Sequence, residues 1–284
     1  MSLAMRVAVR RTTDPRELRR ASSAPTGYDA ELYALVHRGT PGDLAFYARA
    51  CHGSRAVLEL GCGYGRLLPA LADVAGSYVG LDCDAGLLRL ARRARAALDE
   101  PARAKVKLRR GDMRAFRIPE RFDRILIPHS GLFCLQRDAD VLACLRCVRA
   151  HLQDGGELLL DSYAADGFHE RSRPSDVSAE TEEWLARVAM AAVEYDVYER
   201  SRWDRRRRHM TVTYRHVPVG GGRAREGVID HRYLMSAQLR ALLERAGFVV
   251  VEQSGGFRGQ RLSRRSELMV VRARSRAAPR GRQG

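Results

Sequence analysis

The sequence has almost no lysine and no long apolar run. Of its 50 Lys and Arg residues, only Lys105 and Lys107 are lysines, an imbalance typical of a GC-rich coding sequence. A run of about 18 apolar residues is absent, which argues against a membrane-spanning helix. Residues 1–20 contain several Arg but no apolar segment, so they do not resemble a secretory signal. We therefore expect a cytoplasmic protein with no membrane partner.

The 34 acidic residues are fewer than the 50 basic ones, which leaves a net charge of +16. Such a surplus is typical of proteins that bind nucleic acid or anionic lipid. However, residues 258–284 contain nine Arg and one Glu, so about half of the surplus lies in this C-terminal stretch. The run Arg205–Arg208 precedes a strand pattern, which favours a solvated hairpin turn. The distribution of charge thus argues against a nucleic-acid partner.

Six cysteines in 284 residues, widely spaced, do not form a disulfide framework. Cys144 and Cys147 make a C-x-x-C pair inside 138–152, which has the pattern of one amphipathic helix. No second Cys pair or His pair stands at zinc spacing. We interpret both as buried helix residues and expect no metal site.

Short β-rich runs alternate with helical patterns from residue 55 onward, which is typical of parallel βαβ units. The expected strands are 56–60, 77–82, 106–108, 122–127 and 156–161. The expected helices between them are 65–74, 84–98 and 138–152. Asp84 is a suitable N-cap for the second helix, and Asp154–Gly156 should form the turn before the fifth strand. These elements predict an α/β fold with a sheet buried on both faces.

Changes of pattern divide the chain into five parts. We expect an N-terminal helical lid at 1–54, a core at 55–170, an antiparallel β insertion at 171–232, the C-terminal part of the core at 233–274 and a disordered basic tail at 275–284. Within these parts, helices are expected at 29–38, 42–51 and 236–246, and strands at 193–199, 210–216, 248–253 and 267–273.

A glycine-rich loop follows the first core strand. Gly61, Gly63 and Gly65 stand at alternate positions before a helix, where backbone amides can approach a ligand closely. A dinucleotide site needs G-x-G-x-x-G, but Arg66 stands where the last glycine would be, which argues against NAD or FAD. Asp82 ends the next strand, and a carboxylate there can accept hydrogen bonds from both hydroxyls of a ribose.

At this point the sequence resembles the class I S-adenosylmethionine-dependent methyltransferases of the small-molecule type. The similar motifs, in the family's order, are Glu59–Gly65, Gly80–Asp82, Gly111–Met113, Phe122–His129, Leu152–Gly156 and Ala246–Phe248. The resemblance covers about 28–170 and 230–273. It implies a Rossmann-like seven-stranded sheet, with S-adenosylmethionine as the cofactor.

The resemblance also implies roles for individual residues. The first motif would line the methionine part of the cofactor, through Glu59, Gly61, Cys62, Gly63 and Gly65. Asp82 would bind the ribose, Asp112 and Met113 would frame the adenine, and Cys83 would fill space beside the adenine or in the core. From the residues alone, Asp82 could instead cap the next helix and Asp112 could be a turn residue.

The segment Tyr28–Asp43 is similar to the lid that precedes the first strand in many members of this family. Tyr28 and Tyr33 could cover the cofactor, because the face of an aromatic ring attracts a sulfonium. Both could equally be core residues of an amphipathic helix. His37 and Arg38 could clamp a carboxylate or form a solvated helix end.

His129 is the best-placed candidate for a general base or a positioning residue. It follows the fourth strand, at the carboxyl edge of the sheet, and would face the methyl group. Methyl transfer from a sulfonium is an in-line displacement that mainly requires alignment, so a base is useful but optional. The sequence leaves both roles open.

The insertion is expected to form the pocket for the methyl acceptor. Its aromatic residues alternate, so only one of each neighbouring pair can face a pocket; they are Tyr195, Tyr198, Trp203, Tyr214 and His216. The Asn/Asp-Pro-Pro-Tyr/Phe run of enzymes that methylate nucleobase or glutamine amino groups is absent, and Ile127–Ser130 stands in its place. We expect methylation of an O or N atom of a small molecule, as in specialised metabolism. A nucleic-acid methyltransferase and a non-catalytic S-adenosylmethionine-binding protein are the alternatives, and the residues do not indicate an oligomeric state.

Overall fold

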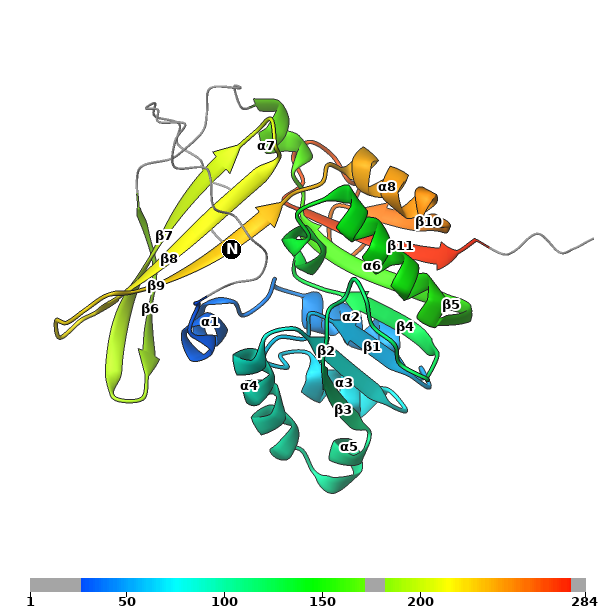
Figure 1. The fold of residues 1–284 in the computed structure, drawn as a ribbon, viewed down its shortest axis with the longest axis horizontal. Coiled ribbons are helices and arrows are strands. Elements are labelled where there is room, and N and C mark those ends of the chain that lie inside the picture. The colour runs from blue at the N-terminus through cyan, green and yellow to red at the C-terminus, as the bar shows by residue number, and fades with distance from the viewer. Residues whose placement is uncertain (1–26, 172–181, 277–284) are drawn as a thin grey trace, which may run out of the picture.

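The computed structural model describes residues 27–171 and 182–276 and contains two β-sheets (Figure 1). The larger sheet has the strand order β10-β11-β5-β4-β1-β2-β3. Its strands are β1 Val57–Leu60, β2 Tyr78–Asp82, β3 Val106–Arg110, β4 Phe122–Ile127, β5 Leu152–Tyr163, β10 Phe248–Ser254 and β11 Leu268–Ser275. Neighbouring strands are parallel, except that β11 is antiparallel to both β5 and β10. The predicted Rossmann-like seven-stranded sheet is confirmed.

Helices cover both faces of this sheet because its central strands are apolar on both sides. Every residue of β1 and β2 is buried. The helices are α1 Ala30–Val36, α2 Asp43–Cys51, α3 Leu68–Val74, α4 Ala85–Ala96, α5 Glu100–Ala104, α6 Asp138–His151, α7 Asp166–Arg171 and α8 Ser236–Arg245, with a 3-10 turn, η2, at Gly131–Cys134. Leu145 of α6 and Leu243 of α8 belong to one core cluster, and Tyr47 of α2 and Leu71 of α3 to a second.

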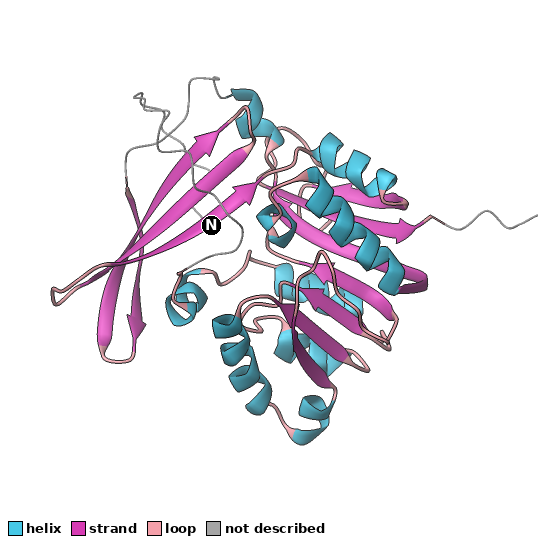
Figure 2. Ribbon diagram, in the orientation of Figure 1, coloured by secondary structure: helices cyan, strands magenta, loops and turns pink. Residues whose placement is uncertain are grey.

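The insertion is a four-stranded antiparallel sheet, β6 Glu183–Met190, β7 Val193–Asp204, β8 His209–Pro218 and β9 Arg225–Arg232. Figure 2 shows it standing apart from the helices that flank the larger sheet. One of its faces packs against the lid, where Leu32 of α1 meets Val197 and Val212 in a third core cluster. Helix α1 also contacts α4, so the lid lies between the insertion and the core.

Most predicted elements are present, with shifted ends. The strand expected at 193–199 is the first part of β7, and the strand expected at 210–216 is the middle part of β8. Arg205–Arg208 is the turn between β7 and β8, as predicted. The strands β6 and β9 were not predicted. The bulge between Trp184 and Ala186 interrupts the alternation of β6, and Gly227 interrupts the apolar pattern of β9.

Two boundaries differ from the prediction. Asp154–Gly156 does not precede the fifth strand but lies within β5, as an irregularity in its pairing with β4. β11 reaches Ser275, and the Arg276 amide donates to the Gly247 carbonyl, so these two residues do not belong to a disordered tail. Residues 1–26 of the predicted lid and 277–284 of the predicted tail lie outside the described residues. No helix in the described part of the chain is long and apolar enough to cross a membrane.

Candidate functional site

The glycine loop between β1 and α3 is held open by its backbone conformation. Gly61, Gly63 and Gly65 have φ of 72°, 54° and 82°, in the left-handed region that favours glycine. A Cβ on Gly63 would meet no atom within 4 Å, whereas a Cβ on Gly65 would lie 3.2 Å from the Cα and Cβ of Ala91. Gly65 therefore allows α4 to pack closely, and Gly63 leaves space above the loop for a ligand.

Asp82 at the end of β2 fixes this loop. Its Oδ2 accepts from the Gly63 amide at 2.7 Å and its Oδ1 from the Asp84 amide at 2.8 Å. Burial raises the pKa of Asp82, and these two hydrogen bonds oppose that shift. Asp84, not Asp82, caps α4 by accepting from the Leu87 amide, as predicted for Asp84. Each carboxylate oxygen of Asp82 keeps a further lone pair, so the side chain can still accept from a ribose.

Two residues of the first motif point below the loop. The Cys62 side chain is buried against Gly80, where a Cβ would lie 2.9 Å from its Sγ. Glu59 is 2% exposed and its Oε2 accepts from the Tyr78 hydroxyl at 2.6 Å. Burial raises the pKa of Glu59 to about 8. Only the backbone of Cys62 is thus available to a ligand, and Glu59 supports the loop from beneath.

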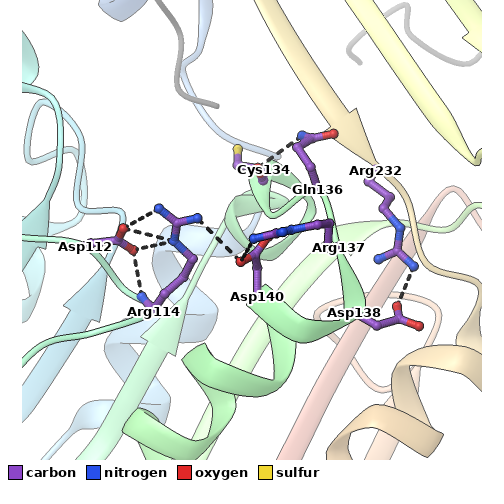
Figure 3. A network of polar contacts seen from close by, with 8 residues as sticks. All are labelled: Asp112, Arg114, Cys134, Gln136, Arg137, Asp138, Asp140 and Arg232. Carbon is purple, nitrogen blue, oxygen red and sulfur yellow. Dashed lines mark hydrogen bonds and ion pairs between the residues drawn. The ribbon is translucent and has the colours of Figure 1, made fainter. Parts of the chain in front are cut away.

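The adenine-side residues follow β3 and β2. Met113 lies close to the loop, since its Cε would be 3.7 Å from a Cβ on Gly61. Asp112 accepts from the Arg114 amide and from its guanidinium, at 2.6 to 3.0 Å (Figure 3). The hydrogen bonds from Arg114 lower the pKa of Asp112. Cys83 is exposed, which rules out a place in the core, and its other expected place, beside the adenine, stays a prediction.

His129 stands at the carboxyl end of β4 in an uncommon backbone conformation, with φ of 51°. Its amide donates to Asp161 Oδ1 at 3.0 Å, and the same oxygen accepts from the Tyr47 hydroxyl at 2.6 Å. Burial raises the pKa of Asp161 to about 6. Burial also lowers the pKa of His129, so its imidazole is neutral at physiological pH.

Three further histidines from the lid and the insertion belong to the same region. Burial lowers the pKa of His37 to about 3, with contributions from the other three histidines, and the His37 and His129 ring centroids are 6.4 Å apart. Burial lowers the pKa of His231 to about 4, with a contribution from His129, and that of His216 to about 4. The edge of the sheet at His129 is thus lined by neutral imidazoles.

The two lid tyrosines occupy different places. The Tyr28 hydroxyl and His216 Nε2 are 3.0 Å apart, and the Tyr28 ring is seated on Gly227, where a Cβ would lie 2.2 Å from it. Tyr28 therefore packs on the insertion and not over the glycine loop. The Tyr33 ring is 4.2 Å from that of His37 and 6.5 Å from that of Tyr64 in the glycine loop, so Tyr33 remains a candidate cover for a cofactor. Arg38 is exposed and its Nε donates to the Leu35 carbonyl, which is a solvated helix end.

The insertion aromatics divide between the two faces of their sheet. Tyr195, Tyr214 and His216 are buried on the face toward the lid. Tyr198 lies under the guanidinium of Arg215. The Trp203 indole donates to the Tyr233 hydroxyl at 2.9 Å and packs in the main core cluster.

Sequence reasoning missed His231 and Tyr163. Their rings stack at 5.8 Å, and Phe133 of η2 packs edge-on to Tyr163 at 5.1 Å. The Tyr163 hydroxyl is buried without a partner among the described residues. Tyr163 ends β5 beside β4, so the rule that parallel strands place ligands at their carboxyl ends could have found it. His231 had no comparable signal, because β9 was not recognised.

Sequence reasoning also missed a link between the lid and the glycine loop. Arg66 donates to both oxygens of Asp43, at 2.6 and 3.0 Å, and Asp43 is 3% exposed. Gly39 leaves room for this guanidinium, since a Cβ there would lie 2.3 Å from its Cζ. Arg66, which stands in place of the last glycine of a dinucleotide-binding loop, thus anchors the lid.

The residues at this edge fit S-adenosylmethionine. Gly63 leaves space for a backbone contact, and Asp82 keeps lone pairs for a ribose. Met113 lies beside the loop on the expected adenine side, and Tyr33 lies near enough to the loop to remain a candidate for the sulfonium contact. No group of three or more His, Cys, Asp or Glu side chains in the described ranges is arranged to hold a metal ion.

Comparison with known proteins agrees with the fold and the loop. Residues 57–156 match a family described as a methyltransferase domain. A solved structure, that of the CcbJ methyltransferase from Streptomyces caelestis, is similar at a TM-score of 0.71 and 25% identity, over 84% of this chain and 92% of that one. The chain therefore has the fold of the class I methyltransferases.

Two curated relatives are similar over shorter stretches. A dTDP-3-amino-3,6-dideoxy-alpha-D-glucopyranose N,N-dimethyltransferase of Streptomyces fradiae is 32% identical over 167 residues, 56% of this chain and 61% of the relative. A cypemycin N-terminal methyltransferase of a Streptomyces species is 31% identical over 107 residues, 38% of this chain and 41% of the relative. The chain thus matches less than two thirds of either relative. Residues 57–156 are thus a methyltransferase domain within a chain that has the methyltransferase fold, and S-adenosylmethionine is the cofactor of this domain.

Proposed function

We propose that this chain methylates an amino nitrogen of a small molecule, with S-adenosylmethionine supplying the methyl group from its sulfonium. The observation that carries this proposal is the group of neutral imidazoles around His129, beside the glycine loop. A neutral imidazole can accept a proton from an ammonium ion. A neutral imidazole is not a general acid, but methyl transfer from a sulfonium does not need one.

An amine suits these imidazoles better than an alcohol does. Amines such as a lysine side chain or an α-amino group have a pKa of about 8 to 10, whereas the pKa of water, close to that of an alcohol, is about 16. A histidine whose pKa lies below 6.5 faces a gap of a few pKa units with an ammonium and of about ten with a hydroxyl. Deprotonation by His129 is therefore accessible only for an amine.

The other residues would position the two substrates. Asp82 would accept from the ribose hydroxyls while it holds the Gly63 amide, and Met113 would pack on the adenine. Asp161 holds the backbone of His129 in place. The unpartnered hydroxyl of Tyr163 would donate to or accept from the acceptor.

The relatives support the choice of nitrogen and of a small acceptor. The name of one curated relative states N,N-dimethylation of an amino sugar, and the name of the other states an N-terminal methyltransferase of cypemycin. A small amine of specialised metabolism is accordingly the acceptor class that we propose for this chain. A cytoplasmic location and the absence of a nucleic-acid partner remain predictions.

The proposal is tested with matched acceptors. The protein is incubated with methyl-labelled S-adenosylmethionine and pairs of compounds that differ only in an amino or a hydroxyl group, including amino sugars, their nucleotide-linked forms and short peptides with a free N-terminus. We expect label on amines only. Transfer to a hydroxyl member, with none to its amino counterpart, would contradict the proposal.

His129→Asn tests the base. Because the pKa of His129 is lowered by burial, the wild-type rate should fall only when pH drops below 6.5. We expect His129→Asn to lower kcat about 100-fold and to remove this acidic limb. His52→Asn is the matched control, since His52 is exposed after α2. An unchanged pH–rate profile in His129→Asn would leave His129 with a positioning role at most.

A further inference from the structure

A series of polar contacts connects the adenine side of the site to the last strand of the insertion (Figure 3). It begins at Asp112, continues through Arg114 to Asp140, and ends where Asp138 accepts from Arg232 of β9. Asp138 and Asp140 are both in the first turn of α6. In this one helical turn, Asp140 contacts Arg114 on the adenine side, and Asp138 contacts Arg232 of the insertion.

Arg114 saturates the Asp112 carboxylate. The Oδ1 atom accepts from the Arg114 amide at 2.8 Å and from its Nε at 3.0 Å, and Oδ2 accepts from Nε at 2.9 Å and from Nη2 at 2.6 Å. A carboxylate has about four lone-pair sites in total. An adenine amino group can therefore donate to Asp112 only if the Arg114 guanidinium gives up part of its contact.

A second carboxylate is in place to receive that guanidinium. Arg114 Nη1 is 3.5 Å from Asp140 Oδ1, a long contact that can shorten. Asp140 is also held by the exposed Arg137, at 2.9 and 3.0 Å. The guanidinium of Arg114 thus has two competing partners, Asp112 and Asp140. When the adenine amino group donates to Asp112, the guanidinium moves toward Asp140.

The first turn of α6 is attached to β9 by two contacts. Arg232, which is 8% exposed, donates through Nη2 to Asp138. Gln136, just before the helix, donates to the Asp230 carbonyl at 3.1 Å. His231 lies between these two attachment points and faces the site with Tyr163. A displacement of the α6 turn therefore changes the position of His231.

We propose that Arg114 is a positioning residue that couples occupation of Asp112 by the adenine amine to the placement of β9, and with it of His231, on the acceptor side. This inference rests on the proposed cofactor site. It means that the acceptor wall is completed only when the cofactor is bound. Arg114 acts through Asp140 and does not itself contact the acceptor.

The two tryptophans of the chain provide a reporter, since both lie in the insertion. Trp203 of β7 donates to the hydroxyl of Tyr233, the residue that follows Arg232. Trp184 of β6 is 57% exposed and far along the sheet from this contact. In a Trp184→Phe background, indole emission reports only on Trp203. S-adenosylhomocysteine binding is measured in parallel by calorimetry, which does not depend on the insertion.

Binding of S-adenosylhomocysteine should change Trp203 emission in this background. The analogue with unsubstituted purine in place of adenine lacks the amino group, and at saturation it should give less than about a third of that change. Arg114→Met should keep S-adenosylhomocysteine binding within about tenfold and lose most of the emission change. Asp140→Asn, which retains Arg114, should also lose it. Arg117→Gln, an exposed arginine of the same loop, is the matched control and should behave like the background.

The outcomes separate this inference from the proposed function. If calorimetry shows binding but Trp203 emission does not change, or if the purine analogue, Arg114→Met and Asp140→Asn all retain the full change, the coupling is wrong and the cofactor site stands. If calorimetry shows no binding of S-adenosylhomocysteine, the proposed function fails, and the coupling fails with it.

Discussion

The buried polar groups near the glycine loop and those of the insertion and lid differ in whether they have hydrogen-bond partners. On the side of the larger sheet, the polar side chains that shape the site are paired within the protein: Asp82 with two amides, Glu59 with Tyr78 and Asp161 with Tyr47. On the side of the insertion and lid, His37 Nε2, His216 Nδ1 and Glu199 Oε2 are buried with no partner among the described residues. The groups around the glycine loop are thus paired, whereas the groups on the acceptor side, including the Tyr163 hydroxyl at the end of β5, leave hydrogen-bonding capacity open.

This difference fits a cofactor that is always the same on the side of the larger sheet, and a methyl acceptor that can vary on the side of the insertion. A buried polar atom without a partner costs about 1 to 3 kcal/mol, so several of them together destabilise the insertion unless a ligand satisfies them. Paired groups give the cofactor side a fixed geometry before any ligand binds. The four predictions below test the two sides in turn.

Glu59→Gln has the largest expected effect, and it concerns stability. The pKa of Glu59 is raised by burial to about 8 in the folded protein, against 4.5 in the unfolded chain. The folded state therefore holds its proton more tightly, and stability is lost as pH rises from 4.5 through 8. Between pH 5 and 9 the wild type should lose about 4 kcal/mol relative to Glu59→Gln, which does not ionise. Urea unfolding of both proteins at the two pH values measures the difference.

A constant difference between the two proteins across this range would contradict a raised pKa for Glu59. Glu199→Gln is the counterpart in the insertion. Burial raises the pKa of Glu199 to about 7, so the same experiment should give the same sign and a smaller change. The two experiments thus compare Glu59, which is hydrogen-bonded to Tyr78 on the cofactor side, with Glu199 of the insertion, which has an unpartnered oxygen.

Asp82→Ala should weaken S-adenosylhomocysteine binding about 100-fold, or roughly 2.7 kcal/mol. The substitution removes the ribose acceptor and also releases the Gly63 amide from its 2.7 Å hydrogen bond. Asp84→Ala is the control, because it removes the N-cap of α4, at a cost of about 1 kcal/mol in stability, but no proposed ligand contact. Calorimetry on both variants measures the affinities. Equal losses in the two would mean that Asp82 acts only through the fold.

The difference between the sides also explains what the sequence could predict. The cofactor side follows local rules: glycines at alternate positions predict the loop, and a carboxylate at a strand end predicts Asp82. Asp112 was added by the resemblance of Gly111–Met113 to a family motif. The acceptor side depends on contacts between distant segments, such as Tyr28 with His216 and Tyr163 with His231. No local pattern marks such pairs, so the sequence left Tyr28 open between a cofactor cover and a core residue, and His231 was not identified at all.

Gly227→Ala should loosen the lid without affecting the cofactor side. A Cβ at this position would lie 2.2 Å from the Tyr28 ring, so the ring has to leave its seat on β9. We expect hydrogen exchange of amides 28–37 to become about tenfold faster, a loss of about 1.4 kcal/mol in the free energy of local opening, while S-adenosylhomocysteine affinity stays within about threefold. Gly220→Ala is the control, because a Cβ there meets nothing within 4 Å. Unchanged exchange in Gly227→Ala would mean that Tyr28 does not hold the lid.

Tyr28→Phe should have the smallest effect, and it separates the ring from the hydroxyl. The ring can keep its stacking on Tyr214 at 5.8 Å, while the hydrogen bond to His216 is lost. One buried hydrogen bond contributes about 0.5 to 1.5 kcal/mol, so exchange of amides 28–37 should become about threefold faster. Tyr198→Phe, under Arg215, should leave it unchanged. Exchange as fast as in Gly227→Ala would mean that the hydroxyl alone holds the lid, whereas wild-type exchange would assign the whole contact to the ring. Either result would show which part of Tyr28 holds the lid on the insertion. Tyr28 and His216 both belong to the acceptor side, so the effect should be confined to that side.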